Sequence, residues 1–323
     1  MLNRAKKHVN LIIKDQVIRY TVSKQSTVDG IIDYGEKFFT NGVVENGKIV
    51  NEKAFTSVLE SLVREKKWRH KNVFFCVPDA SVSIREQLVP KELAKEEIKD
   101  YIHMELEDSI RLPFSNPAID FEILGEENEQ TKILLFAYPK ERLQQYLQVF
   151  NAVRLKPVVA DISSLSLYRL YYQLDRAATK EHLLSVQWDK DSLVLTAFNH
   201  HKPMFTRFLK ASLDTNSWQW SVADNELLWS DEAMPLEGYE QDQFVTIERF
   251  MDFYRYSVMQ GEQQITKILL SGDYPYLDRV EKSLRERLDI KIEPIAMHEQ
   301  QLRIPAKFAD VVGLSIKNTA IRS

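Results

Sequence analysis

The sequence is poor in glycine, contains a single cysteine and lacks any long apolar run, and each shortage narrows the functions it can have. Its nine glycines among 323 residues are under half of the roughly 7% that is average for proteins. Proteins that bind nucleotides usually place glycine where the backbone approaches a phosphate. The shortage therefore argues against a conventional phosphate-binding site.

The lone cysteine, Cys76, lies in the apolar segment 73–77 and cannot form an internal disulfide or a cysteine-based metal site. We expect a buried thiol in a strand. No apolar run approaches the roughly 18 residues that cross a bilayer, and the basic N-terminus precedes only a short strand-like segment, unlike a signal peptide. We therefore expect a cytoplasmic protein without direct membrane insertion, in which any membrane association would have to come through a partner.

The chain also lacks a large excess of positive or negative charge. The chain has 43 Lys and Arg against 47 Asp and Glu, a formal charge of -4, and 44% hydrophobic residues. This composition is typical of a soluble globular protein and gives no general affinity for nucleic acid. The length suggests two domains, or one large domain, with a sizeable core.

Hydrophobic periodicity predicts an α/β protein whose two halves open in the same way, with two strands around a polar turn and then a third strand. We expect a helix beginning near Asn51 and another opened by Pro139, and a charged amphipathic helix over 91–112. The strands expected are 9–13, 17–22, 30–39, 73–77, 82–89, 119–124, 132–137, 157–160, 183–188, 192–198, 204–209, 268–270 and 290–295. The remaining helices expected are 163–173, 247–259, 275–288 and 307–317.

An acidic tract with interleaved tryptophans covers residues 211–243 and contains no Lys or Arg. We favour packing of Trp218, Trp220 and Trp229 onto the second half, with the acids in solvent. A docking surface for a basic partner is the alternative.

Several runs in order resemble the PilM family of actin-like type IV pilus assembly proteins. They are Phe75 to Pro78, Arg85 to Pro90, Glu105 to Glu107, Leu112 to Phe114, Ile119 to Phe121, Leu134 to Ala137 with Lys140 and Glu141, Pro157 to Asp161 with Leu165, Phe205 to Arg207, and Val312 to Leu314. The resemblance implies an actin-like two-domain fold of the actin–hexokinase superfamily, with an inserted subdomain in domain 1. It implies domain 1 at 1–178 with the insert at about 85–139, domain 2 at 179–305 with a variable segment at 211–243, and a C-terminal helix at 306–323 returning to domain 1.

In this superfamily, the resemblance implies, the two domain-opening hairpins hold the phosphates of ATP and its metal. The positions that usually carry glycine or a metal-binding Asp differ here. At the first hairpin, Ile12 takes the place of the Asp and Lys14 that of the Gly. At the second hairpin, Gln187 takes the place of the Asp and Asp189 that of the Gly, and Asp191 lies beside it. At the adenosine side, Ser271 and Gly272 take the place of the usual Gly-Gly pair. We interpret the chain as a pseudo-ATPase that binds neither ATP nor Mg²⁺. A metal held by Asp189 and Asp191 is the weaker alternative.

PilM-like proteins capture the cytoplasmic N-terminal tail of PilN, a bitopic membrane protein, in a groove between the first subdomain and its insert. By this resemblance, apolar residues of the insert are candidates to line the groove. They are Ile102, Leu106, Ile110, Leu112 and Phe114.

The sequence therefore predicts a non-catalytic scaffold of a type IV pilus or competence pseudopilus platform, with a pilus assembly ATPase as a second partner. No catalytic residue or metal site is expected, because the neighbours of Glu105 and His200 do not form a constellation that carries chemistry. The alternatives are an ATP-binding actin-like regulator whose nucleotide state gates partner binding, and a polymerising division or shape actin. Pilus assembly, DNA uptake and secretion remain open.

Overall fold

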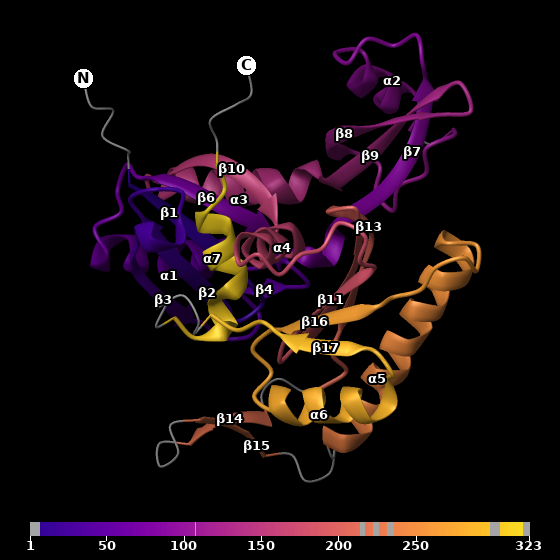
Figure 1. Cartoon of the computed structure of the whole chain (residues 1–323). Coiled ribbons are helices and arrows are strands. Elements are labelled where there is room, and N and C mark those ends of the chain that lie inside the picture. The colour runs from indigo at the N-terminus through magenta and orange to yellow at the C-terminus, as the bar shows by residue number, and fades with distance from the viewer. Residues whose placement is uncertain are drawn as a thin grey trace.

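Two five-stranded sheets with the same internal pattern organise the computed structural model (Figure 1). The structure describes residues 7–106, 108–213, 217–221, 226–230, 236–297 and 304–318. We call the first sheet with its helices lobe 1 and the second sheet with its helices lobe 2. The domain boundaries predicted from the resemblance remain predictions.

Lobe 1 is built on a sheet in the order β10-β6-β1-β2-β3, in which β1, β2 and β3 run antiparallel and β6 and β10 run parallel to β1. Its strands are β1 (His8–Ile13), β2 (Val17–Ser23), β3 (Ile31–Phe38), β6 (Asn72–Val77) and β10 (Lys156–Ile162). The small hairpin beside it is β4 (Val44–Glu45) with β5 (Lys48–Ile49). Its helices are α1 (Glu52–Glu65), α3 (Lys140–Ala152) and α4 (Ser163–Gln173). Asn51 caps α1, since its side-chain oxygen accepts from the Ala54 N–H at 3.1 Å, and Pro139 precedes α3, so both predicted helix starts are confirmed.

Lobe 2 repeats this pattern in the order β13-β12-β11-β16-β17. Its strands are β11 (Leu183–Trp188), β12 (Ser192–Asn199), β13 (Lys202–Lys210), β16 (Lys267–Ser271) and β17 (Lys291–Pro294). Its helices are α5 (Leu236–Phe253), which continues as a short π-helix over Tyr254–Val258, and α6 (Leu277–Arg287). In each lobe an antiparallel hairpin opens the sheet and two parallel strands extend it, so both predicted openings are confirmed.

The insert is a separate three-stranded antiparallel sheet in the order β7-β9-β8, at the upper right of Figure 1. Its elements are β7 (Ser83–Pro90), α2 (Ile98–Met104), β8 (Pro117–Glu127) and β9 (Gln130–Pro139). The long helix predicted over 91–112 is wrong, because only seven of those residues are α-helical. The predicted apolar residues do pack over the small sheet, but they come from a short helix and from the loop after it. Ile98 and Ile102 in α2 and Ile110 in the loop are buried against Val89 and Leu135. The turn after Met104 brings Ile110 back onto the core that Ile98 and Ile102 enter.

The last helix, α7 (Ala309–Ser315), lies beside α4 between the lobes, as Figure 1 shows. Val311, Val312 and Leu314 are buried there in a core shared with Leu183 and Leu269 of lobe 2. Gly313 permits the close approach, because a Cβ at this position would lie 1.8 Å from the Ser166 carbonyl oxygen of α4. This helix therefore joins both lobes.

Within the acidic tract the structure describes a two-stranded hairpin of β14 (Trp218–Ser221) and β15 (Glu226–Trp229). Trp218 and Trp229 meet edge to face and pack against the core of lobe 2, near Tyr274. The packing interpretation is confirmed for these two rings. The side chain of Trp220 and the acids Asp214, Asp224, Asp231 and Glu232 lie outside the described residues.

Across the described residues, no helix combines the length and apolar character that crossing a membrane requires.

Candidate functional site

The turns of the two lobe-opening hairpins face each other across the interlobe cleft, and charged side chains join them. Lys14, in the turn between β1 and β2, places its Nζ 2.5 Å from the Asp189 carboxylate at the end of β11 and 3.6 Å from Asp310 of α7. The Lys14 and Asp189 side chains are almost completely shielded from solvent. A lysine therefore occupies the position between the hairpins that the resemblance assigns to phosphate.

A second ion pair crosses the cleft from β2 of lobe 1 to the residues after β16 of lobe 2. Arg19 of β2 is 1% exposed, and its guanidinium pairs with Asp273, which follows β16, and with Glu36 of β3 at 3.2 Å. Asp273 also accepts a hydrogen bond from the Lys190 backbone N–H at 2.9 Å, and its own N–H donates to Asp189 at 3.2 Å. The two pairs are thus parts of one buried network.

Opposing effects act on the pKa values of this network. Burial alone would lower the pKa of Lys14, but Asp189 and Asp310 raise it above its ordinary value. Burial alone would raise the pKa of Asp273, but Arg19, with Lys14, holds it well below its usual range. Burial raises the pKa of Asp189 to about 7 against the attraction of Lys14. The cations therefore stay charged, while burial favours the neutral form of Asp189.

The space left between the hairpins is small. A cavity of about 30 Å³, bordered by Lys14, Asp79, Asp189 and Asp191, remains there. That volume accommodates one or two water molecules, whereas a triphosphate with its metal needs far more. The pKa of Asp191 is raised by burial, with the charge of Asp273 adding to the shift. Phosphate would meet four carboxylates in this space, those of Asp15, Asp79, Asp189 and Asp191, and the ammonium of Lys14 is already paired.

The remaining sequence-predicted positions have structural roles. Ile12 is buried in the core shared by the two lobes. Gln187 accepts from the Ser163 hydroxyl at 3.3 Å. Ser271 is buried at the end of β16. Gly272 has φ +129°, and a Cβ on it would lie 2.0 Å from the Trp188 carbonyl oxygen. The one glycine retained at the predicted adenosine side is therefore required by backbone packing.

Sequence reasoning missed Arg19, Glu36, Asp273 and Asp310. A signal was present for Arg19, which interrupts the apolar β2 sequence Val-Ile-Arg-Tyr-Thr-Val, because a cation inside a buried strand needs a buried partner. Among the described residues, no group of three or more His, Cys, Asp or Glu side chains is arranged to hold a metal.

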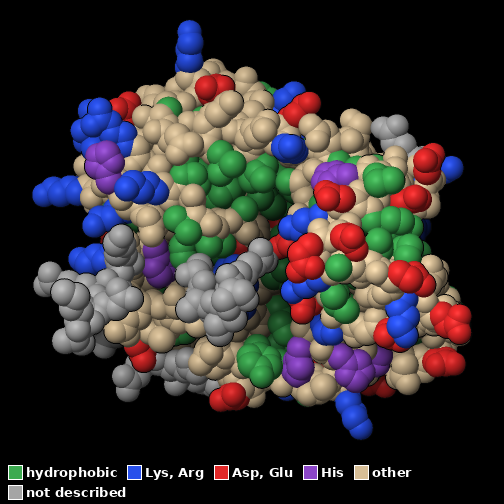
Figure 2. Space-filling view, turned by 90° about the horizontal axis from the view of Figure 1, so that it is seen from above, with side chains coloured by type: hydrophobic (Ala, Val, Ile, Leu, Met, Phe, Trp, Pro, Cys, Tyr) green, Lys and Arg blue, Asp and Glu red, His purple; other side chains and the backbone are tan. Residues whose placement is uncertain are grey.

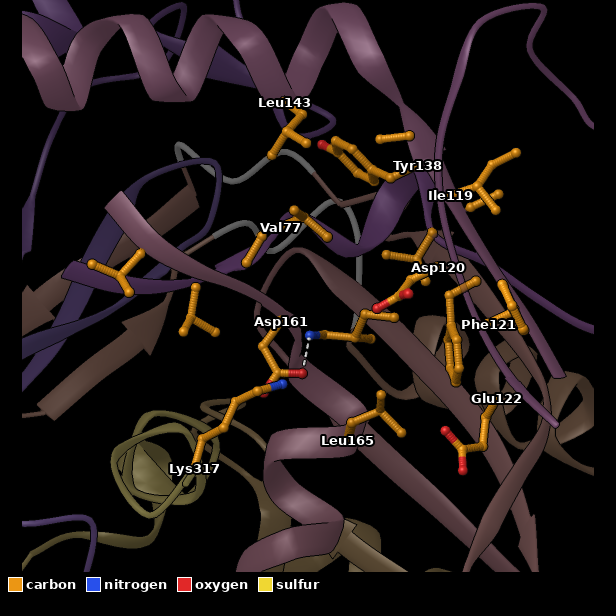
Figure 3. Close-up of a pocket in the computed structure, with 18 of the residues that line it drawn as sticks. Val77, Ile119, Asp120, Phe121, Glu122, Tyr138, Leu143, Asp161, Leu165 and Lys317 are labelled. Atoms are coloured by element: carbon orange, nitrogen blue, oxygen red, sulfur yellow. Dashed lines mark hydrogen bonds and ion pairs between the residues drawn. The ribbon is translucent and has the colours of Figure 1, made fainter. Parts of the chain in front are cut away.

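A second concave site lies between lobe 1 and the insert. This groove has a volume of about 740 Å³ and is bordered by β10 and the start of α4 on one side and by β8 and β9 on the other. In Figure 3, Leu143 and Tyr138 line its upper part, Ile119 to Glu122 run along one wall, and Asp161, Leu165 and Lys317 lie below. The space-filling view shows apolar side chains in the hollow (Figure 2).

None of the five predicted groove residues lines this cavity. Ile102 and Ile110 are fully buried in the core of the insert, which leaves them no surface for a partner, and Leu106 and Leu112 pack against that core. Phe114 is half-buried in the loop before β8. The groove is instead lined by the edges of two sheets, and the residues on those edges are the ones that sequence reasoning missed.

Among the residues that the structure describes, both edge strands of the groove are paired on one side only. β10 pairs with β6, and β8 pairs with β9. Val158 on β10 is 53% exposed. Charged groups in the groove are held by ion pairs: Asp161 is bound by Lys317 at 3.0 Å and by Arg169 at 2.8 Å, and Asp120 by Lys99 at 3.4 Å. The site therefore offers apolar pockets between two free strand edges, which is the arrangement that receives an extended peptide.

Solved structures similar to this chain include one from the PilM-PilN type IV pilus biogenesis complex, with a TM-score of 0.71, 18% identity and coverage of 97% of this chain and 100% of that chain. The cytoplasmic domain of EpsL, an inner membrane component of the type II secretion system of Vibrio cholerae, matches with a TM-score of 0.51, 12% identity and coverage of 96% and 93%. A Bacteroides thetaiotaomicron protein with an actin-like ATPase fold and unknown function matches with a TM-score of 0.50, 10% identity and coverage of 98% and 100%. The predicted actin-like α/β fold is confirmed.

No curated protein sequence matches this chain. The profile of the family described as type IV pilus assembly protein PilM matches residues 14–210. That segment covers lobe 1 apart from β1, the insert and the first three strands of lobe 2, and it is more than half of the 323 residues. The chain therefore belongs to the PilM family of type IV pilus assembly proteins.

Proposed function

We propose that this protein is a non-catalytic scaffold of a type IV pilus assembly platform, and that its groove binds the cytoplasmic N-terminal tail of a PilN-like bitopic membrane protein. The observation that carries the proposal is the groove between β10 and β8, with its apolar lining and its two free strand edges. One of the similar structures reported above is from a PilM-PilN complex, which supports a partner of this kind.

An extended tail fits the groove because each strand edge offers unpaired backbone groups at a fixed spacing. Backbone hydrogen bonds along β10 or β8 would supply affinity that does not depend on sequence, and every second side chain of the tail would enter the groove. Val158 and Leu165 give that face apolar character. Glu122 on the β8 wall favours a tail that carries a basic residue.

The scaffold role, rather than nucleotide hydrolysis, is supported by the cleft. ATP would have to displace the Lys14–Asp189 pair and place its phosphates beside Asp189, Asp191 and Asp79. Two unit charges of the same sign about 4 Å apart cost on the order of 4 kcal/mol at an effective dielectric of 20. In our proposal the ion network holds the lobes together in place of nucleotide, the protein stays in the cytoplasm at the membrane through its partner, and a pilus assembly ATPase is its second contact.

The test is a titration of a labelled peptide of the partner's cytoplasmic tail, followed by fluorescence anisotropy, without nucleotide and with millimolar Mg-ATP. We expect binding that Mg-ATP leaves unchanged, and no thermal shift by Mg-ATP. A nucleotide at 100 times its Kd would stabilise the fold by about 2.7 kcal/mol, which such a melt detects. Val158→Asp places a charge in the groove and should weaken binding at least tenfold.

Ile32→Asp is the matched control, since Ile32 is 45% exposed on β3, the opposite edge of the same sheet. Equal binding by both variants would overturn the groove assignment. A clear Mg-ATP shift would support the nucleotide-gated regulator, and filaments that pellet on centrifugation would support the polymerising actin.

A further inference from the structure

Uncompensated positive charge gathers at one end of lobe 1, where parallel strands begin. The turn at 66–72 precedes β6 and the turn at 151–157 leads into β10, and neither contains an acidic residue. These two turns and the residue before β1 form what we call the basic patch: Lys7, Lys67, Arg69, His70, Lys71, Arg154 and Lys156.

Backbone hydrogen bonds fix the two turns against each other. The His70 N–H donates to the Arg154 carbonyl oxygen at 2.6 Å, and the Lys156 N–H donates to the Lys71 carbonyl oxygen at 2.9 Å. Asn72 then pairs with Lys156 on one side and with His8 on the other. Because β10, β6 and β1 are parallel, their N-terminal ends share one edge of the sheet. The fold therefore brings together cations that are up to about 150 positions apart in sequence.

These cations have no internal partner. Within the described part of the chain no salt bridge involves Lys67, Arg69 or Arg154, which are all exposed, nor the other Lys side chains of the patch. Only Lys66, beside the patch, is paired, with Asp33. Since the whole chain carries a formal charge of -4, the excess of positive charge here is a local feature opposed to the overall balance.

The basic patch adjoins the groove. β10 begins at Lys156 and supplies groove-lining residues from Val158 to Ile162, so the groove starts about 7 Å along the strand at 3.3 Å per residue. In Figure 2, blue side chains gather at the left of the apolar hollow, on the side where Figure 1 places β1 and β6. One face of the molecule therefore presents both the groove and the patch.

We propose that the basic patch binds the anionic headgroups of a membrane surface and orients the groove toward the bilayer. The choice of a membrane, as opposed to a protein or a nucleic acid, draws on the proposed function: a tail that emerges from a bilayer brings the neighbouring surface close to that bilayer. Trp68, the one Trp, Tyr or Phe in the two turns, is 3% exposed and packs against Tyr20, so it offers no surface on which bases would stack. Contact is electrostatic and without insertion.

The test is co-sedimentation of the full chain with vesicles of phosphatidylcholine alone and with equal parts phosphatidylglycerol, in the absence of any partner tail. We expect binding to the anionic vesicles only, and its loss at 0.5 M salt, where charges are screened over a few ångströms. Each Lys or Arg near an anionic surface contributes about fivefold in affinity. The variant Lys67→Glu/Arg69→Glu/Arg154→Glu/Lys156→Glu should therefore bind at least a hundredfold more weakly.

The matched control reverses four exposed cations outside the patch, Lys53, Lys95, Arg249 and Lys282, and should bind nearly as well as the wild type at the same net charge. Equal loss in both quadruple variants, or binding by wild type that does not depend on phosphatidylglycerol, would overturn the proposal. So would patch-dependent binding of a labelled 20-base-pair DNA duplex without vesicle binding. Val158→Asp separates the two proposals, since it should lose the tail peptide and keep the vesicles.

Discussion

Arg19 shows how one residue makes the cleft depend on charge. A guanidinium that is 1% exposed and lies between Asp273 and Glu36 is stable only while those carboxylates remain. Removing one partner of a buried pair leaves the other charge without compensation, and this commonly costs 3 to 5 kcal/mol. The buried guanidinium therefore requires both carboxylates, whatever the net contribution of the network to stability.

We expect Arg19→Met to lower the free energy of unfolding by about 3 kcal/mol, since it strands Asp273 in a buried site. Adding Asp273→Asn should recover part of the loss, because the amide oxygen still accepts from the Lys190 N–H while the charge is gone. Urea unfolding of the wild type, the single and the double variant measures both effects. Lys91→Met breaks an exposed pair with Glu126 and serves as control, with little change expected. A double variant less stable than Arg19→Met would contradict this account.

Asp79 gives the protein a pH dependence of defined sign. Burial raises its pKa to about 6, against the hydrogen bond donated by Ser163 at 2.6 Å. The folded-state pKa lies above the unfolded value of about 3.9, so the folded state binds this proton more tightly. The charge at Asp79 therefore costs stability that is absent below about pH 4, grows as the pH rises, and is complete above about pH 6.

We expect Asp79→Asn to be more stable than the wild type by about 1 to 2 kcal/mol at pH 8, because the amide accepts from Ser163 without a buried charge. The difference should shrink as the pH falls and vanish near pH 4. Denaturant unfolding of both proteins at pH 4, 6 and 8 tests this. A difference of the same size at all three values would mean that charge is not its origin.

At the scale of elements, the packing of α7 on α4 depends on one missing side chain. Gly313 lies in α7, where alanine would be the better helix former by about 1 kcal/mol. Its Cβ, however, would stand 1.8 Å from a backbone oxygen of α4, so the helices would have to move apart. Two effects of opposite sign meet here, and the steric effect is the larger.

We expect Gly313→Ala to destabilise the protein by about 1 to 3 kcal/mol, the usual range for overpacking a core. Gly238→Ala is the matched control, because Gly238 also lies in a helix, α5, and has open space around its Cα; it should stabilise by about 1 kcal/mol or less. Thermal and urea unfolding compare the two. Stabilisation by both substitutions would show that α7 can shift without loss.

At the scale of the whole molecule, the individual helices and strands could be predicted from the sequence better than the contacts between distant elements. The β1 and β2 hairpin, Asn51 before α1 and Pro139 before α3 are local signals, and local physics produced the expected structure. The ion network joins Lys14 to Asp189 and Asp310, 175 and 296 positions away. No spacing rule links residues so far apart, and only the packing of α7 between the lobes brings them together.

The groove illustrates the same limit. The apolar stripe around Ile102 and Ile110 is a strong pattern, and its cause is the core of the insert. The groove lining comes from Val158 and from Phe121, which belong to strands at sheet edges. Whether a strand lies at the edge of a sheet depends on the topology of the whole sheet and not on the sequence of that strand. The residues that line the groove could therefore not be identified before the strand order was known.

The position of α7 in the chain has a consequence for how the protein is made. Residues 309–315 complete a core that β1, β2 and α4 begin, although those elements are translated long before. Before residue 309 has been translated, lobe 1 therefore has an open apolar slot where α7 will pack. We expect a product that stops before this residue to expose the slot to chaperones and proteases, and a product that includes α7 to hide it.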